Sequence, residues 1–480
     1  MSIATEPELE PDLEHHPDRP ARRSARRLVA VGVLLALVLL TASALGLVRF
    51  DATSDLDGTA TVVGPAAAVV ATQVSSPVNP SPDTLDELIE SLQLRLDRIP
   101  ADTTAWATLG LAYVQQAKVT VNPAFYALAD GALTESLERS VAQGPADDNF
   151  LVHAGLSALA SARHDFVAAR DHARRGLGIN DFSAILHGAL SDAELQLGNY
   201  PAAFAAIDRM IELSPDTASF ARASYAAELR GDAPLAEAWM TDALEAAPTP
   251  TDRAFALFHL GELAFDDGRP GDALDLYNEA RRAAPSDPAA LAGKAKAEAA
   301  LGQVETALDH YAQLVEQAPD PAYLAAYGIL LESLGRSDEA AAQFAIVDAT
   351  RALFADNGVQ LDAGPILFEA DHGDVDTALA AAETGVAAHP FLAMHDAHAW
   401  ALHRSGRHVE ALAAAERAAA TGYRHASFLF HSGMIKEALG DADGAIADLT
   451  AALELNPYFD PLSAPVAVAT LADLTDSTDR

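Results

Sequence analysis

A repeating pattern with a period of about 34 residues runs through most of this 480-residue chain and narrows its fold to the repeat architectures. Prolines that close short helical patterns stand at Pro215, Pro248, Pro285, Pro319, Pro390 and Pro457. Between them a turn glycine recurs at Gly198, Gly231, Gly268, Gly302, Gly335, Gly373, Gly406 and Gly440. The fifth residue after each glycine is an alanine, at Ala203, Ala236, Ala273, Ala307, Ala340, Ala378, Ala411 and Ala445.

This spacing predicts pairs of antiparallel helices. A helix of about three turns can end at the glycine, which adopts the left-handed conformation of a helix end without strain. The second helix packs closely on the first where the alanine lies, because a small side chain lets two backbones approach. Proline then stops the second helix. Stacked pairs of this kind form a solenoid.

Several residues match a known repeat. Trp106, Leu109, Gly110 and Tyr113 fit W-x2-L-G-x2-Y, and the most complete unit carries Leu260, Gly261, Gly268, Ala273, Tyr277, Ala280 and Pro285. The pattern resembles the tetratricopeptide repeat family. The resemblance implies an all-α, right-handed superhelical solenoid of about ten helix-turn-helix repeats over residues 103–459. The ten units are 103–147, 150–183, 184–216, 217–250, 254–287, 288–320, 321–354, 359–391, 392–424 and 426–459.

The N-terminus predicts a membrane anchor. Residues 1–27 carry six acids and then five arginines, which is typical of a disordered tail. Leu28–Val48 has no charge, and roughly 20 apolar residues suffice to span a membrane as a helix. The arginines before it keep residues 1–27 cytoplasmic and place the rest of the chain outside the cytoplasm. The alternative is a signal peptide cleaved at Ala42-Ser43-Ala44, which leaves a secreted protein.

Three shorter segments flank the predicted solenoid. Residues 49–83 end in a proline-containing polar stretch and predict a linker. Residues 84–102 contain an amphipathic helix, with Thr84 and Glu87 as a capping box, that we expect to cover the first unit. Residues 460–480 are expected to form a C-terminal cap followed by an acidic tail.

Composition and missing motifs exclude several functions. The formal net charge of −38 argues against binding nucleic acid. The chain contains no cysteine, so it has neither a thiolate metal site nor a cysteine nucleophile. It also lacks the phosphate-binding glycine loops, the nucleophile elbow and the H-E-x-x-H zinc motif. We therefore predict that the protein is not an enzyme and carries no cofactor.

The concave groove is the predicted binding surface. In the family that the chain resembles, positions 2, 5, 9 and 12 of each first helix point into the groove. In the fifth unit, that register gives a stripe of aromatic residues that the packing face of the helix does not need. It also gives further positions in three other units. The predicted groove residues are Tyr225, Phe255, Phe258, Glu262, Phe265, Asp396, Trp400, His403, Phe430 and Met434.

Histidines offer an alternative site. Seven of the sixteen lie between residues 389 and 431, and His395 and His398 are three residues apart on one predicted helix. Such a pair can chelate zinc or nickel if a third ligand joins it, or it can hydrogen-bond within the scaffold. Our prediction assigns no metal ligands.

The leading functional hypothesis is a membrane-tethered scaffold outside the cytoplasm that binds peptide or protein segments, basic ones in particular, in its groove. Its setting would be the assembly or regulation of an envelope or transport complex. The alternative is an accessory protein that binds a metal or small ligand through the histidine-rich C-terminal units. Residues 396–402 and 430–435 are similar to the C-terminal ends of membrane-associated bacterial repeat proteins, which implies bacterial origin and no particular activity.

Overall fold

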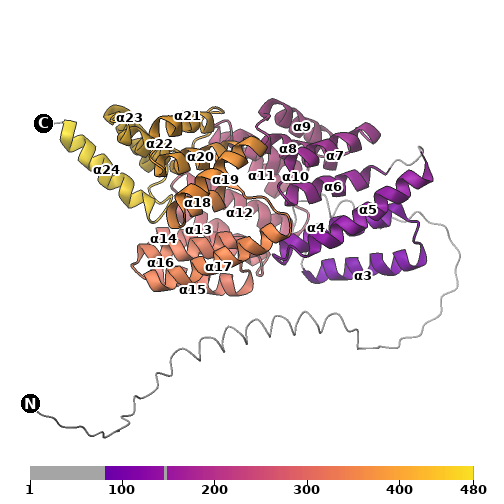
Figure 1. Cartoon of the computed structure of the whole chain (residues 1–480). Helices are drawn as coiled ribbons and strands as arrows, with labels where there is room; N and C mark the ends of the chain where they lie inside the picture. Colours follow the sequence, from indigo (N-terminus) through magenta and orange to yellow (C-terminus); the bar gives the residue numbers. More distant parts are fainter. Residues whose placement is uncertain (1–81, 145–148, 479–480) are drawn as a thin grey trace, which may run out of the picture. The chain divides into compact units, whose positions relative to one another are not determined.

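The computed structural model describes residues 82–144 and 149–478, which belong to one compact unit of the chain. Within these ranges the protein consists of 22 helices, α3 to α24, and contains no strand (Figure 1). None of the described helices has both the length and the apolar character required to cross a membrane. The predicted tail, the span Leu28–Val48 and all but the end of the predicted linker lie outside the described residues.

Each of the ten units contains one pair of helices. The first five pairs are α4 (Thr103–Val119) with α5 (Phe125–Gln143), α6 (Phe150–Ala162) with α7 (Phe166–Ile179), α8 (Ala184–Gln196) with α9 (Tyr200–Leu213), α10 (Thr217–Glu228) with α11 (Ala233–Glu245), and α12 (Pro250–Asp266) with α13 (Pro270–Ala283). The other five are α14 (Pro288–Ala300) with α15 (Val304–Gln317), α16 (Pro321–Ser333) with α17 (Ser337–Asp356), α18 (Ala363–His372) with α19 (Val375–Ala388), α20 (Leu392–Arg404) with α21 (His408–Ala418), and α22 (Ala426–Ala438) with α23 (Ala442–Leu455).

The turn glycines behave as the spacing predicts, with one exception. Gly198, Gly231 and Gly268 have φ between 69° and 73°, in the left-handed region that only glycine adopts without strain. Gly373 has φ −123°, because α18 is short and ends differently. Side-chain caps fix the starts of several helices; at α10, Asp216 and Ser219 form a reciprocal capping box.

Large side chains interlock with glycines where neighbouring units meet. Leu133 fills the space above Gly110 and Gly155, so a Cβ at either glycine would overlap its side chain. In the fifth and sixth units Tyr277 occupies the same kind of space between Gly261 and Gly293. Each glycine therefore admits a second-helix side chain between two successive first helices, which holds adjacent units in register.

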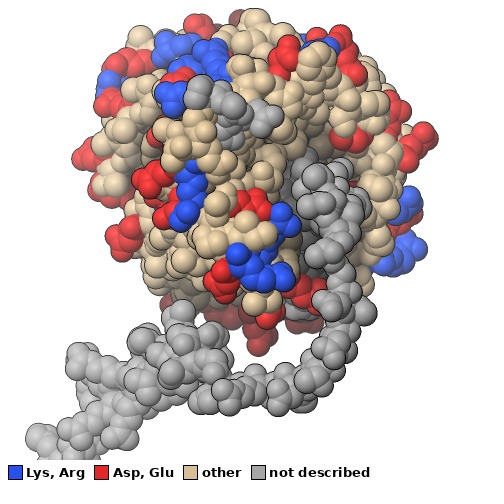
Figure 2. Space-filling view, turned by 90° about the vertical axis from the view of Figure 1, so that its right-hand side faces the viewer, with Lys and Arg blue, Asp and Glu red and all other residues tan. Residues whose placement is uncertain are grey.

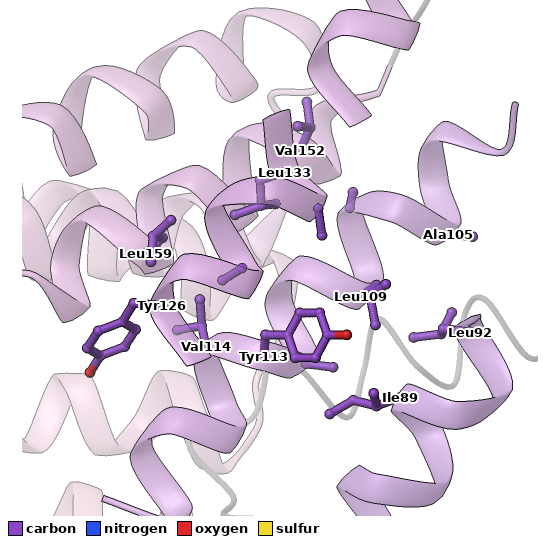
Figure 3. Packing of buried hydrophobic residues seen from close by; sticks show 14 of the residues in the cluster. Ile89, Leu92, Ala105, Leu109, Tyr113, Val114, Tyr126, Leu133, Val152 and Leu159 are labelled. Carbon is purple, nitrogen blue, oxygen red and sulfur yellow. The ribbon is translucent and has the colours of Figure 1, made fainter. Parts of the chain in front are cut away.

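Both ends of the row of units are covered by an extra helix. At the N-terminal end, α3 (Pro82–Arg98) buries Ile89 and Leu92 against the first unit, and Figure 3 shows these side chains beside Leu109 and Tyr113. At the other end, α24 (Ser463–Thr478) contributes the fully buried Ala467 to the C-terminal core. These helices keep the apolar faces of the terminal units away from water.

Units that are far apart in sequence also meet. We call this contact the seam: it joins the inter-helix turns 163–165, 197–199, 230–232 and 267–269 to the connecting segments 359–362, 389–391, 422–425 and 455–457. The backbone amide of Gln360 donates to the carbonyl of Arg163 at 3.1 Å. The amide of Leu392 donates to the hydroxyl of Tyr200 at 3.0 Å, across 192 residues. The turns of the second to fifth units thus meet segments that lie between the seventh unit and the end of the tenth, five or six units further along the chain.

Candidate functional site: the inner wall

Two cavities lie between helices of the units, and we call the residues that line them the inner wall. The first cavity, of about 250 Å³, lies between α8, α10 and α12. The second, of about 610 Å³, lies among α16, α17, α18 and α22. The second cavity is within the range of about 300–1,000 Å³ that is typical of ligand pockets, and the first is slightly below it.

Three predicted groove residues, Tyr225, Phe255 and Glu262, line the first cavity. Tyr225 lies on α10 and its side chain is 38% exposed, while Phe255 on α12 is half-buried across the same space. Burial among the surrounding helices, followed by the charge of Glu228, raises the pKa of Tyr225, so its hydroxyl stays protonated. An aromatic ring that is open to solvent inside a walled space can receive an apolar or cationic side chain.

Charged side chains surround the first cavity and are mostly paired. Arg222 binds both carboxylate oxygens of Asp192, at 2.8 and 2.7 Å. Glu262 accepts a hydrogen bond from Lys296 at 2.8 Å and another from the hydroxyl of Tyr277 at 2.5 Å. Burial opposes the ionisation of Glu262, but the charge of Lys296 and these two hydrogen bonds together lower its pKa.

Glu228 is the carboxylate among the described residues of this region that has no basic partner. Burial, and then the nearby charge of Asp266, raises its pKa to about 7, while a hydrogen bond from the hydroxyl of Tyr423 partly offsets the shift. Burial also raises the pKa of Asp266. Because the folded-state pKa of Glu228 lies above its usual value of 4.5, the stability it contributes is complete below that value and is lost as the pH rises through about 7.

Three more predicted residues are already engaged in the scaffold. The half-buried Phe258 packs against His259 and Tyr277, with ring centroids 5.1 and 5.9 Å apart. His403 stacks on Trp400 and approaches His408, and burial lowers the pKa of His403 to about 4. The half-buried Met434 packs against the C-terminal core.

Four predicted groove residues are buried instead of facing an open groove. Phe265 is 3% exposed, because the next unit covers it through Ala297 and Lys296. The others, all in the ninth and tenth units, are Asp396, Trp400 and Phe430, which are 1%, 7% and 3% exposed. Their register positions point toward adjacent units: the indole of Trp400 donates to Asp371 at 2.9 Å, and Asp396 accepts from His431.

The second cavity is lined by the predicted groove residue Phe430 and otherwise by residues that the repeat register did not single out. Phe430 and His431 contribute to its wall, and the apolar remainder comes from α17, α18 and the segment between them, through Val347, Phe354, Val359, Leu361, Leu367 and Phe368. The doubled interval from Pro319 to Pro390 was the available signal, because it marks an irregular connection at residues 357–362. Polar groups on the rim are occupied, since Asp320 and Asp362 cap α16 and α18.

The histidine pair lies apart from any third ligand. Burial lowers the pKa of both His395 and His398, which favours the neutral imidazole. Neither ring nitrogen of His398 has a hydrogen-bond partner. Among the described residues no group of three or more histidines, aspartates or glutamates is arranged to hold a metal ion.

The outer surface gives no sign of a broad basic patch on the face shown in Figure 2. Lysine and arginine side chains form small groups there with acidic side chains beside them, and uncharged residues cover most of the area between. This distribution agrees with the net charge of −38.

Comparison with known families identifies the repeats. Models described as tetratricopeptide repeat match residues 189–249 and 397–458, and another of the same description matches residues 264–330. The matched ranges cover the third and fourth units, the ninth and tenth, and the stretch from the fifth into the seventh. No curated protein matches the chain.

Solved structures show similar helical repeats. The Cut9–Hcn1 hetero-tetramer of APC/C is 14% identical, over 76% of this chain and 76% of that chain, with a TM-score of 0.41. Pseudomonas aeruginosa pilF is 16% identical over 41% of this chain and 89% of that chain, with a TM-score of 0.35. A tetratricopeptide repeat protein from Parabacteroides merdae is 19% identical over 54% and 98%, with a TM-score of 0.31. Identities and scores this low transfer no partner or activity.

Proposed function

Because this chain is a tetratricopeptide repeat protein, we propose that it is a non-catalytic scaffold whose inner wall binds a segment of a partner protein. Proteins built from such repeats generally bind protein or peptide partners and are typically scaffolds without catalytic activity. The first cavity, between α8, α10 and α12, is the proposed contact point, and the bound segment presents a basic side chain to it.

The observation that carries this proposal is the combination of Tyr225 and Glu228 in one walled space. The phenol ring of Tyr225 is accessible, and Glu228 faces Asp266 and Glu262 without a cation of its own among the described residues. The basic residues nearby, Arg222 and Lys296, are already paired with carboxylates. A lysine or arginine side chain from a partner would supply the missing positive charge and stack on the ring.

Replacing Glu228 with glutamine should weaken binding of an eight-residue oligolysine peptide about tenfold, since a charge-assisted hydrogen bond is lost. In the wild-type protein, affinity should rise between about pH 6 and pH 8, because Glu228 ionises with a pKa of about 7. The Glu228→Gln variant should lose most of this pH dependence. Isothermal titration calorimetry at constant ionic strength measures both effects.

The matched control is Glu245→Gln, which removes the same charge from an exposed position at the end of α11. It should change affinity less than twofold, since isolated surface charges contribute little. An octaglutamate peptide should not bind. Equal losses in the two glutamine variants would show that oligolysine binds the acidic surface as a whole, and the cavity would then have no specific role.

We also propose that the scaffold is tethered to the cell membrane through Leu28–Val48 and works outside the cytoplasm, in the assembly or regulation of an envelope or transport complex. The support is the uncharged length of that segment and the five arginines that precede it. A tag after residue 480 should be digested by protease added to intact spheroplasts, whereas a tag before residue 1 should be protected. Protection of the C-terminal tag would contradict the proposed orientation.

A further inference from the structure

The seam runs beside the first cavity. Its connecting segment 422–425 carries Tyr423, whose hydroxyl hydrogen-bonds to Glu228, and His425, which lies near Asp266. Glu228, which lines the cavity, and Asp266 belong to the opposite side, at the ends of α10 and α12. Tyr423 and Glu228 are 195 residues apart in the chain.

Close backbone contacts hold the two sides together. A Cβ at Gly198 would lie 2.9 Å from the carbonyl oxygen of Pro390, and one at Gly268 would lie 2.8 Å from that of Leu455. Gly231 approaches the carbonyl of Gly422 even more closely. An apolar cluster supports this backbone contact, with Leu195 and Leu229 on one side and Phe391 and Leu392 on the other.

The seam differs in kind from the contacts between neighbouring units. In a solenoid each unit is stabilised by its own hairpin and by the units directly before and after it. The glycine interlocks at Leu133 and Tyr277 belong to those neighbour contacts and do not involve the seam. Separating the two sides therefore breaks seam contacts without unfolding any helix pair. Small rotations of successive units relative to one another, spread over six units, suffice for the movement.

We propose that the chain opens along the seam to admit the partner segment and closes again around it, which makes the seam a gate to the inner wall. This inference rests on the proposed binding function. A small cation can reach the first cavity while the seam is closed, because Tyr225 is accessible to solvent. An extended peptide spanning several units requires the opening.

Locking the seam tests the gate. The chain has no cysteine, so Arg230→Cys together with Arg424→Cys introduces a single pair, on exposed residues beside the Gly231–Gly422 contact. A short bismaleimide should join them across the seam. The linked protein should bind the oligolysine peptide at least tenfold more slowly than the unlinked double variant, while its affinity for n-butylammonium stays the same. Stopped-flow fluorescence with labelled peptide and NMR titration with the amine give these values.

The matched control links neighbouring units instead. Glu305→Cys with Glu339→Cys places the pair on the sixth and seventh units, where both glutamates lie near Arg336. That link should leave peptide association unchanged, because those units stay packed when the seam opens. Equal peptide association rates with and without the seam link would overturn the gate and leave the proposed function standing.

A measurement without any ligand separates the two proposals. Spin labels on the two introduced cysteines of the Arg230→Cys, Arg424→Cys variant should show a main short distance and a minor longer one by double electron–electron resonance, and the linked pair should show only the short one. A single short distance in the unlinked protein, with and without peptide, would overturn the gate even if the peptide binds elsewhere. Failure of both peptide and amine to bind, together with two distances, would instead overturn the proposed binding function.

Discussion

Tyr277→Ala should lower the free energy of unfolding by about 3–5 kcal/mol, the range for removing a buried aromatic ring. The side chain of Tyr277 is 0% exposed and fills the space above Gly261 and Gly293. Neither glycine offers atoms that can move into the vacancy, so a cavity remains between the fifth and sixth units. The hydroxyl bond to Glu262 is lost as well, which leaves that carboxylate with Lys296 alone.

Urea unfolding followed by circular dichroism measures this loss, and hydrogen exchange locates it. Exchange should accelerate in α12 to α15 before it does in α4 to α7, because neighbour contacts transmit the defect only locally. Tyr277→Phe is the control, since it keeps the ring and removes only the hydroxyl; it should cost about 1–2 kcal/mol. A cost below about 1 kcal/mol for the alanine variant would contradict the interlock.

His431→Ala should cost about 3–5 kcal/mol, because it leaves a buried carboxylate without its hydrogen-bond donor. Nδ1 of His431 lies 3.0 and 2.9 Å from the two carboxylate oxygens of Asp396, and the two residues are 7% and 1% exposed. The ring also stacks on Trp400, with centroids 4.3 Å apart. The pair ties α20 to α22 and holds the ninth unit against the tenth.

A double-mutant cycle with Asp396→Ala isolates the pair. Removing both partners should cost less than the sum of the single changes, since no unpaired charge remains buried. The free energies come from urea unfolding at a fixed pH. Strict additivity of the two single costs would show that His431 and Asp396 contribute independently, through packing alone.

The repeating elements of the fold could be predicted from local sequence. Glycine at a helix end and alanine five residues later have the same consequence wherever they occur, so the third to tenth units follow from spacing alone. The exceptions are local too. The long helix α17 and the short helix α18 lie within the interval from Pro319 to Pro390, where one closing proline is missing. The regular period did not predict their lengths.

The inner wall was harder to predict, because a register position does not say how closely the next unit approaches. Tyr225 and Phe255 line a cavity, whereas Phe265 is covered by the neighbouring unit and Trp400 reaches back to Asp371. Glu228 was missed since its distinctive property, a carboxylate without a cation, depends on residues from α12 and from segment 422–425. These residues are far apart in the chain, so the local sequence around Glu228 does not predict that they surround it.

The seam sets a limit on how this protein can evolve. Open solenoids lengthen or shorten by duplication or loss of whole units, since each unit needs only its neighbours. Here the turn at Gly198 meets Pro390 and the turn at Gly231 meets Gly422, so the number of units between them is part of the structure. Gain or loss of one unit would place other residues at these backbone contacts. The contacts leave no room for a side chain, so the new residues would not fit. Descendants that keep the seam are therefore expected to vary in sequence while conserving their unit count.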